Sequence, residues 1–155
     1  SSLSPVHRIG DQIGEAIRLH EHVSKKEARL RTLELLRKVE IPRPETAIDA
    51  YPFEYSGGMR QRFGIAQALI GNPELIIVDE PTAGLDPNQI LEIRKLVRQL
   101  GKTVLLSTHI LQEVGEMADR VLLINEGRLV FDGPSQDLKK EKSLDKWFHK
   151  LTLAA

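Results

Sequence analysis

The first third of the chain has a helical pattern of apolar residues. In residues 8–20 and 24–39, apolar side chains recur every three or four positions, so each segment carries one apolar face. The apolar positions of the second segment are Leu30, Leu33, Leu36 and Val39. Ser24 and Glu27 have the spacing of a capping box, which predicts where this helix begins. Two helices are therefore expected, followed by a proline-rich loop over residues 41–55.

From Ser56 onward, predicted helices alternate with short apolar strands. Residues 75–78 and 104–106 are uniformly apolar, which is typical of strands buried on both faces. Asp86 is expected to be the N-cap of the next helix, because Pro87 follows it and suits the first helical position. Further helices are expected over residues 57–70, 87–100, 110–118 and 135–151, and a hairpin over residues 121–124 and 129–131. The alternation predicts an α/β fold, mostly a parallel sheet flanked by helices, after an N-terminal α-helical subdomain.

The composition is that of an ordinary globular protein. Of the 155 residues, 41% are apolar and 28% are charged, and the formal net charge is zero. A neutral chain gives no electrostatic argument for binding nucleic acid or an anionic membrane. The chain has no cysteine, which excludes disulfides and thiolate metal sites, and no apolar run approaches the length of a membrane span.

Two consecutive carboxylates follow the first predicted strand. Asp79 and Glu80 are expected at the carboxyl end of a parallel strand, where α/β proteins bind their ligands. In phosphoryl transfer, one carboxylate holds Mg²⁺ and a second residue orients or deprotonates the attacking water. Asp79 suits the first role and Glu80 the second. The competing interpretation, an acidic pair that ends a strand and points to solvent, has about equal weight on this pattern alone.

Two further stretches have the residues of a phosphate site. Ser56, Gly57 and Gly58 open a predicted helix, and glycines there let the backbone approach an anion closely. A plain N-cap explains the serine equally well, but two glycines weaken a first turn that has no other purpose. His109 follows the second predicted strand and would face the same edge, although a lone histidine is more often structural.

Taken in order, SGGMRQR, LIIVDEPTAGLDP and LLSTH resemble three motifs of the nucleotide-binding domains of the ATP-binding cassette (ABC) family. The first resembles the signature motif, the second the Walker B segment with its D-loop, and the third the switch histidine. The resemblance covers nearly the whole chain. It implies a RecA-like P-loop NTPase core, of which residues 71–155 would form the carboxyl-terminal part, and a signature-containing helical subdomain over residues 1–70.

The resemblance also implies a role for each motif residue. Ser56, Gly57 and Gly58 match the signature residues that grip the γ-phosphate of ATP bound to the opposing subunit, and Gln61 would support them. The other matches are Asp79 with the Mg²⁺-associated carboxylate, Glu80 with the catalytic base, Asp86 with the D-loop aspartate at the dimer interface, and His109 with the switch. The implied reaction is Mg²⁺-dependent ATP hydrolysis that drives transport.

The chain departs from the family in having no Walker A motif. Gly101-Lys102-Thr103 has the last three residue types of that motif, but Leu96 stands where the first glycine belongs. The triplet also follows a predicted helix, so Gly101 is interpreted as a helix C-cap. The chain is expected to be the carboxyl-terminal two-thirds of an ABC ATPase that neither binds ATP tightly nor hydrolyses it alone. Its strands are then expected to have unpaired edges and to associate.

The family resemblance implies two partners, a second nucleotide-binding domain and a transmembrane permease subunit contacted through residues 8–55. The implied location is cytoplasmic, on the inner face of the membrane. The first part of the chain resembles peptide importers and the part from about Phe63 resembles exporter-type systems, so an artificial chimera stays open. Two alternatives also stay open: a docking module without catalysis, and a DNA-repair or translation ATPase of the same family.

Overall fold

The computed structural model describes residues 3–139 and 146–149 of the chain. These residues form two compact units, one that ends at Ser107 and one that begins at Thr108. Each unit is described by itself below. This division concerns compactness alone, and it does not test the expected functional division at residue 70.

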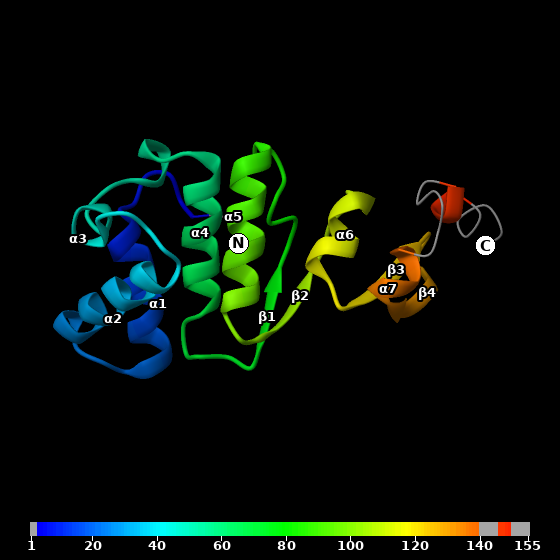
Figure 1. Ribbon diagram of the computed structural model, residues 1–155. Helices are drawn as coiled ribbons and strands as arrows, with labels where there is room; N and C mark the ends of the chain where they lie inside the picture. Colours follow the sequence, from blue (N-terminus) through cyan, green and yellow to red (C-terminus); the bar gives the residue numbers. More distant parts are fainter. Residues whose placement is uncertain (1–2, 140–145, 150–155) are drawn as a thin grey trace. The chain divides into compact units, whose positions relative to one another are not determined.

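The first unit begins with a group of helices (Figure 1). They are α1 (Ile9–Glu21), α2 (Lys25–Lys38), α3 (Pro44–Ala47), a 3₁₀ turn (Pro52–Glu54) and α4 (Gly57–Ala68). Of these, α1, α2 and α4 match predicted helices, whereas residues 41–55, predicted as a loop, contain the short helix α3 and the 3₁₀ turn. The Ser24 hydroxyl accepts a hydrogen bond from Glu27 N at 3.2 Å, which confirms the predicted start of α2. No helix in the described part of the chain is both long enough and apolar enough to span a bilayer.

The apolar face of α1 matches its prediction, and that of α2 matches it at three of four positions, since Leu36 and Val39 are buried and Leu33 packs against the core. Ile9, Ile13 and Ile17 are buried on α1. On α2 the buried residues are Ala28, Thr32 and Leu36, and Leu30 is 54% exposed. The prediction that Leu30 belongs to the packed stripe is therefore wrong. Its place in the core is taken by Thr32, whose hydroxyl donates to Ala28 O at 2.8 Å and is therefore satisfied without water.

An ion pair at the surface fastens α2 to the segment after α3. The Arg29 guanidinium donates to both carboxylate oxygens of Asp49, at 2.9 and 2.8 Å. This hydrogen-bonded pairing holds the pKa of Asp49 below its ordinary value. Because both side chains are about half exposed, the pair orients the segment more than it stabilises the fold.

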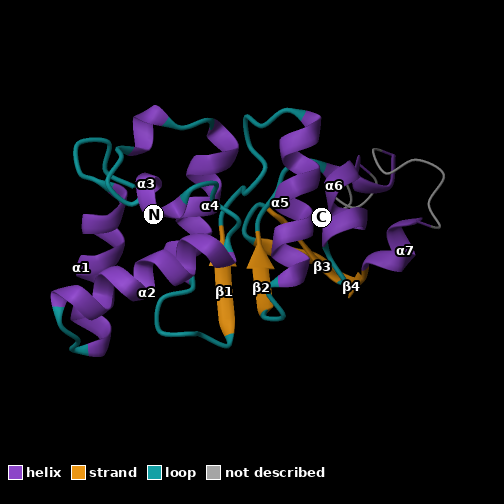
Figure 2. Ribbon diagram, turned by 60° about the vertical axis from the view of Figure 1, so that its left-hand side comes forward, coloured by secondary structure: helices purple, strands orange, loops and turns teal. Residues whose placement is uncertain are grey.

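A parallel pair of strands completes the first unit. β1 (Leu75–Val78) pairs with β2 (Thr103–Leu106) in parallel, and α5 (Pro87–Gln99) connects them. Asp86 accepts from Asn88 N and Gln89 N at 2.9 and 3.0 Å, which confirms the predicted N-cap of α5. Gly101 has a φ of +59°, as expected of a residue that ends a helix. Figure 2 shows the two strands side by side as parallel arrows.

The prediction that both strands are buried on two faces is wrong. On one face, Ile76 is buried in the core that α4 and α5 also enter, and Val104 packs against the same core. On the other face, Ile77 and its cross-strand partner Leu105 are 68% and 50% exposed. A uniformly apolar run cannot tell burial on two faces from burial on one, because both faces are apolar either way.

The second unit contains the predicted hairpin. β3 (Arg120–Asn125) pairs antiparallel with β4 (Arg128–Pro134) across a turn at Glu126 and Gly127, both of which have positive φ. Before the hairpin lies α6 (Leu111–Met117), and after it lies α7 (Ser135–Lys139). α7 confirms the start of the helix predicted over residues 135–151, and residues 140–145 and 150–151 of that prediction lie outside the described residues.

The exposed face of the two-stranded sheet predicts self-association of the chain. We expect the sedimentation-average mass of the wild type to rise with concentration, because apolar sheet faces and edges associate. Ile77→Lys combined with Leu105→Glu, which places opposite charges across the strands, should reduce this rise. Leu91→Lys on α5 is the control, because Leu91 is an exposed leucine outside the sheet. A wild type that stays monomeric, or an equal effect of the control, contradicts the prediction.

Candidate functional site

The two predicted carboxylates lie at the carboxyl end of β1, where Ser107 joins them to β2. The backbone pairing continues past the strands, since Ser107 N donates to Val78 O at 3.1 Å. The Ser107 hydroxyl donates to Asp79 Oδ1 at 2.5 Å and accepts from Glu80 N at 2.9 Å. One hydroxyl therefore sets the position of both acidic residues. Asp79 is exposed and Glu80 is half-buried, so both are within reach of a ligand.

The backbone is unusual at Glu80. Its φ is +44°, a left-handed conformation that costs a side-chain-bearing residue free energy and that five other non-glycine residues of the described chain also adopt. A turn follows directly, because Ala83 N donates to Glu80 O and Leu85 N donates to Thr82 O, both at 3.2 Å. This compact turn, residues 80–86, carries the chain from the carboxylates to Asp86.

The donor set at this edge fits Mg²⁺ that is held largely by a nucleotide. No group of three or more acidic, histidine or cysteine side chains able to hold a metal ion occurs among the described residues. Asp79 therefore offers a single carboxylate, and one of its oxygens already accepts from Ser107. Mg²⁺ is commonly bound in proteins by one or two carboxylates with substrate phosphates and water. Asp79 is the residue that would hold it.

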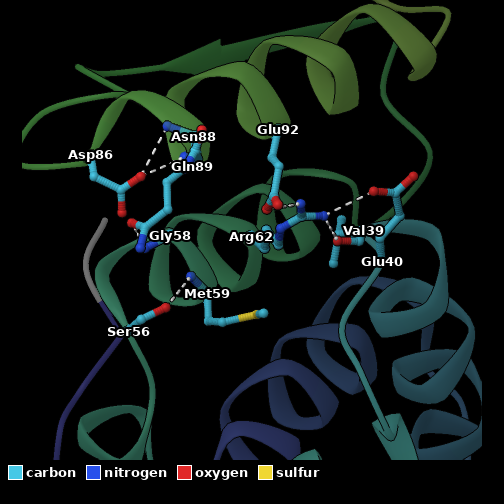
Figure 3. Close-up of polar contacts among 10 residues, drawn as sticks. All are labelled: Val39, Glu40, Ser56, Gly58, Met59, Arg62, Asp86, Asn88, Gln89 and Glu92. Carbon is cyan, nitrogen blue, oxygen red and sulfur yellow. Dashed lines mark hydrogen bonds and ion pairs between the residues drawn. The ribbon is translucent and has the colours of Figure 1, made fainter.

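The predicted phosphate turn forms the first turn of α4 (Figure 3). The Ser56 hydroxyl caps the helix by accepting from Met59 N at 3.5 Å, which is long for such a bond. Gly58 N donates to Gln89 Oε1 of α5 at 3.2 Å. The backbone N–H groups of this turn point to the side where the helix dipole favours an anion.

The two glycines allow close packing of α4 against residues 85 and 89. A Cβ atom on Gly57 would lie 3.1 Å from Cδ2 of Leu85. A Cβ atom on Gly58 would lie 3.1 Å from Oε1 of Gln89 and 3.3 Å from its Cδ. Both distances are shorter than ordinary carbon contacts, so a side chain at either position would displace residues 85 or 89. The glycine pair thus lets α4 approach the turn that carries Asp86.

Arg62 connects three helices one turn further along α4. It is only 5% exposed, and its guanidinium donates to Val39 O at 2.9 Å and to Glu40 at 3.1 Å. Its other terminal nitrogen donates to Glu92 of α5 at 3.0 Å. Figure 3 shows the guanidinium between these partners. Arg62 therefore fixes α4 against both α5 and the end of α2.

The other predicted site residues are less tightly placed. Gln61 lies on α4 and is half-buried. His109 is exposed and belongs to the second unit, so the structure does not place it relative to Asp79 and Glu80. Beside it, the Thr108 hydroxyl accepts from Ile110 N at 3.1 Å and shapes the start of α6.

Three residues of the site were missed by the sequence analysis: Ser107, Gln89 and Arg62. Arg62 could have been found, because it shares a helical face with buried Ile65 and Leu69. Gln89 occupies a position where a polar side chain is ordinary at a helix start, so no pattern distinguishes it.

Comparison with known proteins gives one matching family. The family described as "ABC transporter" matches residues 2–83, more than half of the chain. A putative peptide import ATP-binding protein of Brucella ovis is 47% identical over 142 residues, which are 89% of this chain and 42% of that protein. The dipeptide transport ATP-binding protein DppD of Haemophilus influenzae is 43% identical over 145 residues, 91% of this chain and 44% of that protein.

A solved structure extends the similarity to the fold. It is the dimer of the ATP-binding cassette MJ0796 bound to ADP and Pi after hydrolysis. It matches with a TM-score of 0.72 and 29% identity, over 86% of this chain and 59% of that chain. The chain thus spans about two fifths of the length of the curated relatives named here.

The Arg62 contacts predict a large effect on stability. Arg62→Met keeps the length and the apolar stem but removes the donors to Val39 O, Glu40 and Glu92. We expect the free energy of unfolding in urea to fall by about 2 to 3 kcal/mol, because a buried carbonyl loses its charged partner.

Arg60→Met is the matched control for this prediction. Arg60 is exposed on the same helix and donates only to Tyr55 O, at 3.2 Å. Its loss should change the free energy of unfolding by no more than about 0.5 kcal/mol. Equal losses for the two variants would show that Arg62 does not hold the helices together.

Proposed function

The chain belongs to the ABC transporter family, and we propose from this that it serves ATP hydrolysis coupled to transport. In this proposal it contributes a phosphate-gripping turn and catalytic carboxylates to an ATP site formed with a second nucleotide-binding domain. The observation that carries the proposal is the packing of the Ser56–Gly58 turn against the segment that continues from Asp79 and Glu80. The turn would grip one ATP molecule and the carboxylates would act on another, and the packing holds the turn and the carboxylate segment together.

The turn of Ser56, Gly57 and Gly58 is the proposed grip on the γ-phosphate. Its support is the capped first turn of α4, whose N–H groups and dipole favour a negative charge. Gln61 follows on the same helix and is proposed to steady the grip. The family resemblance implies that the phosphate would come from ATP that is held by the opposing subunit.

Asp79 and Glu80 are the proposed catalytic pair. Asp79 would hold Mg²⁺, which supplies charge stabilisation to the phosphates when it is bound. Glu80 would accept the proton of the attacking water. The Ser107 hydroxyl would hold the Asp79 carboxylate and the Glu80 backbone in a fixed relation.

Asp86 and His109 are proposed to complete the site at the dimer interface. Asp86 already caps α5 through two backbone N–H groups, so its position relative to the Gly58 turn is fixed. His109 would contact the γ-phosphate as the switch. Residues 1–70 and 71–155 would then act as a helical subdomain and as part of a RecA-like core.

The proposed partners are a second nucleotide-binding domain and a transmembrane permease subunit. Residues 8–55, which include α1 and α2, would contact the permease on the inner face of the membrane. The named relatives have peptide import and dipeptide transport in their names, which favours import of peptides. The chain has no Walker A motif of its own, so its turn would act on ATP that another domain supplies.

A pair of substitutions at Ser56 separates the phosphate role from the capping role. Asp and Asn both cap helices as well as serine does, but only aspartate repels phosphate. The measurement is Mg-ATP-dependent association with a peptide-import relative whose residue aligned with Glu80 is changed to Gln, with Mg-ADP as the reference. We expect Ser56→Asn to associate nearly as the wild type, and Ser56→Asp to associate at least about tenfold more weakly.

Two results would contradict the proposal. Equal association of Ser56→Asp and Ser56→Asn would show that Ser56 is a helix cap and nothing more. An absence of Mg-ATP-dependent association for the wild type would show that the turn does not complete another domain's ATP site.

A further inference from the structure

The Gln89 side chain is hydrogen-bonded to the Gly58 N–H group, a donor that the proposed phosphate grip would use. Its side chain reaches from the first turn of α5 across to α4, where Oε1 accepts from Gly58 N at 3.2 Å. The contact is close along the whole end of the side chain, because a Cβ on Gly58 would meet Oε1, Cδ and Cγ within 3.4 Å. One N–H group makes one good hydrogen bond, so Gln89 and an anion exclude each other at this donor.

The surroundings hold Gln89 in this position. Asp86 accepts from Gln89 N at 3.0 Å, which fixes the backbone from which the side chain extends. One turn further along both helices, Arg62 donates to Glu92 at 3.0 Å. The two contacts, a turn apart on α4 and on α5, keep the helices at one separation and Gln89 over Gly58 (Figure 3).

We propose that Gln89 is a positioning residue that competes with a phosphoryl oxygen for Gly58 N–H. The inference rests on the proposed function of the Ser56–Gly58 turn. A phosphoryl oxygen is charged and the amide oxygen is neutral, so the phosphoryl group makes the stronger bond and displaces Gln89. Without phosphate, Gln89 satisfies the donor and keeps the turn in the shape that phosphate binds.

Displacement of Gln89 also links phosphate binding to Asp86. Gln89 and Asp86 lie in the same capped turn of α5. When Gln89 leaves Gly58, α5 loses the polar contact with α4 that lies in the same turn as Asp86. Gln89 would therefore couple phosphate binding at the Ser56–Gly58 turn to the position of Asp86 at the proposed dimer interface.

The test uses the ¹⁵N-labelled 155-residue chain and inorganic phosphate as the probe, at constant ionic strength set with chloride. The first measurement, without phosphate, is hydrogen exchange of the Gly58 amide. We expect exchange about fivefold faster in Gln89→Met, which has the same length but lacks the acceptor, than in the wild type. Gln89→Glu keeps an acceptor oxygen, so its Gly58 amide should exchange as slowly as that of the wild type.

The second measurement is the phosphate concentration that half-saturates the shift of the Gly58 amide signal. Competition predicts a half-saturating concentration about fivefold lower in Gln89→Met than in the wild type, and higher in Gln89→Glu, whose charge repels phosphate. Asn88→Met is the matched control, because Asn88 is the exposed neighbour on the same turn. It should match the wild type in both measurements, and unchanged signals from α1 and α2 show that each variant is folded.

The possible outcomes separate this inference from the proposed function. Equal half-saturation in the wild type and Gln89→Met overturns the competition and leaves the phosphate grip standing. If phosphate shifts the Gly58 signal in none of the variants, the competition is overturned, whereas the grip is decided separately by the Mg-ATP-dependent association of the Ser56 variants. Equal exchange of the Gly58 amide in the wild type and Gln89→Met also overturns the inference, because Gln89 then does not hold that donor.

Discussion

The first turn of α4 lies so close to the segment from Leu85 to Gln89 that a Cβ atom on Gly57 or Gly58 would lie 3.1 Å from the Leu85 or Gln89 side chain, which would have to give by a few tenths of an ångström. The rest of the proposed site depends on this approach. It brings Gly58 N–H to Gln89, sets the Ser56 cap beside the turn that carries Asp86, and aligns α4 with α5 for the Arg62–Glu92 contact. The same two glycines therefore provide backbone N–H donors for a phosphate and allow the close packing that fixes those donors.

The second constraint is the bond between the ends of the two parallel strands. Ser107 accepts from Glu80 N and donates to Asp79, so the acidic pair is positioned by β2 although it belongs to β1. The left-handed backbone of Glu80 then turns the chain sharply towards Asp86. A short segment thus links the carboxylates at the sheet edge to the glycine turn.

Much of this arrangement could be predicted from the sequence. The helices, the parallel pairing, the hairpin and the caps at Ser24 and Asp86 follow from spacing and local chemistry, and the motif order identified the family. The contacts between elements could not be predicted in this way. Nothing in the local sequence shows that Gln89 crosses to Gly58, or that Ser107 holds the carboxylates, and the apolar runs of β1 and β2 do not reveal that one face is exposed. Such facts depend on which elements become neighbours.

The most direct test of the account is a double-mutant cycle between Gly58 and Gln89, followed by urea unfolding. If the close approach is real, Gly58→Ala should destabilise the chain by about 1 kcal/mol more with Gln89 present than in the Gln89→Ala background. In that background, alanine should even stabilise α4, because it favours the helix over glycine. An equal effect of Gly58→Ala in both backgrounds would contradict the account, since the glycine would then not be making room for Gln89.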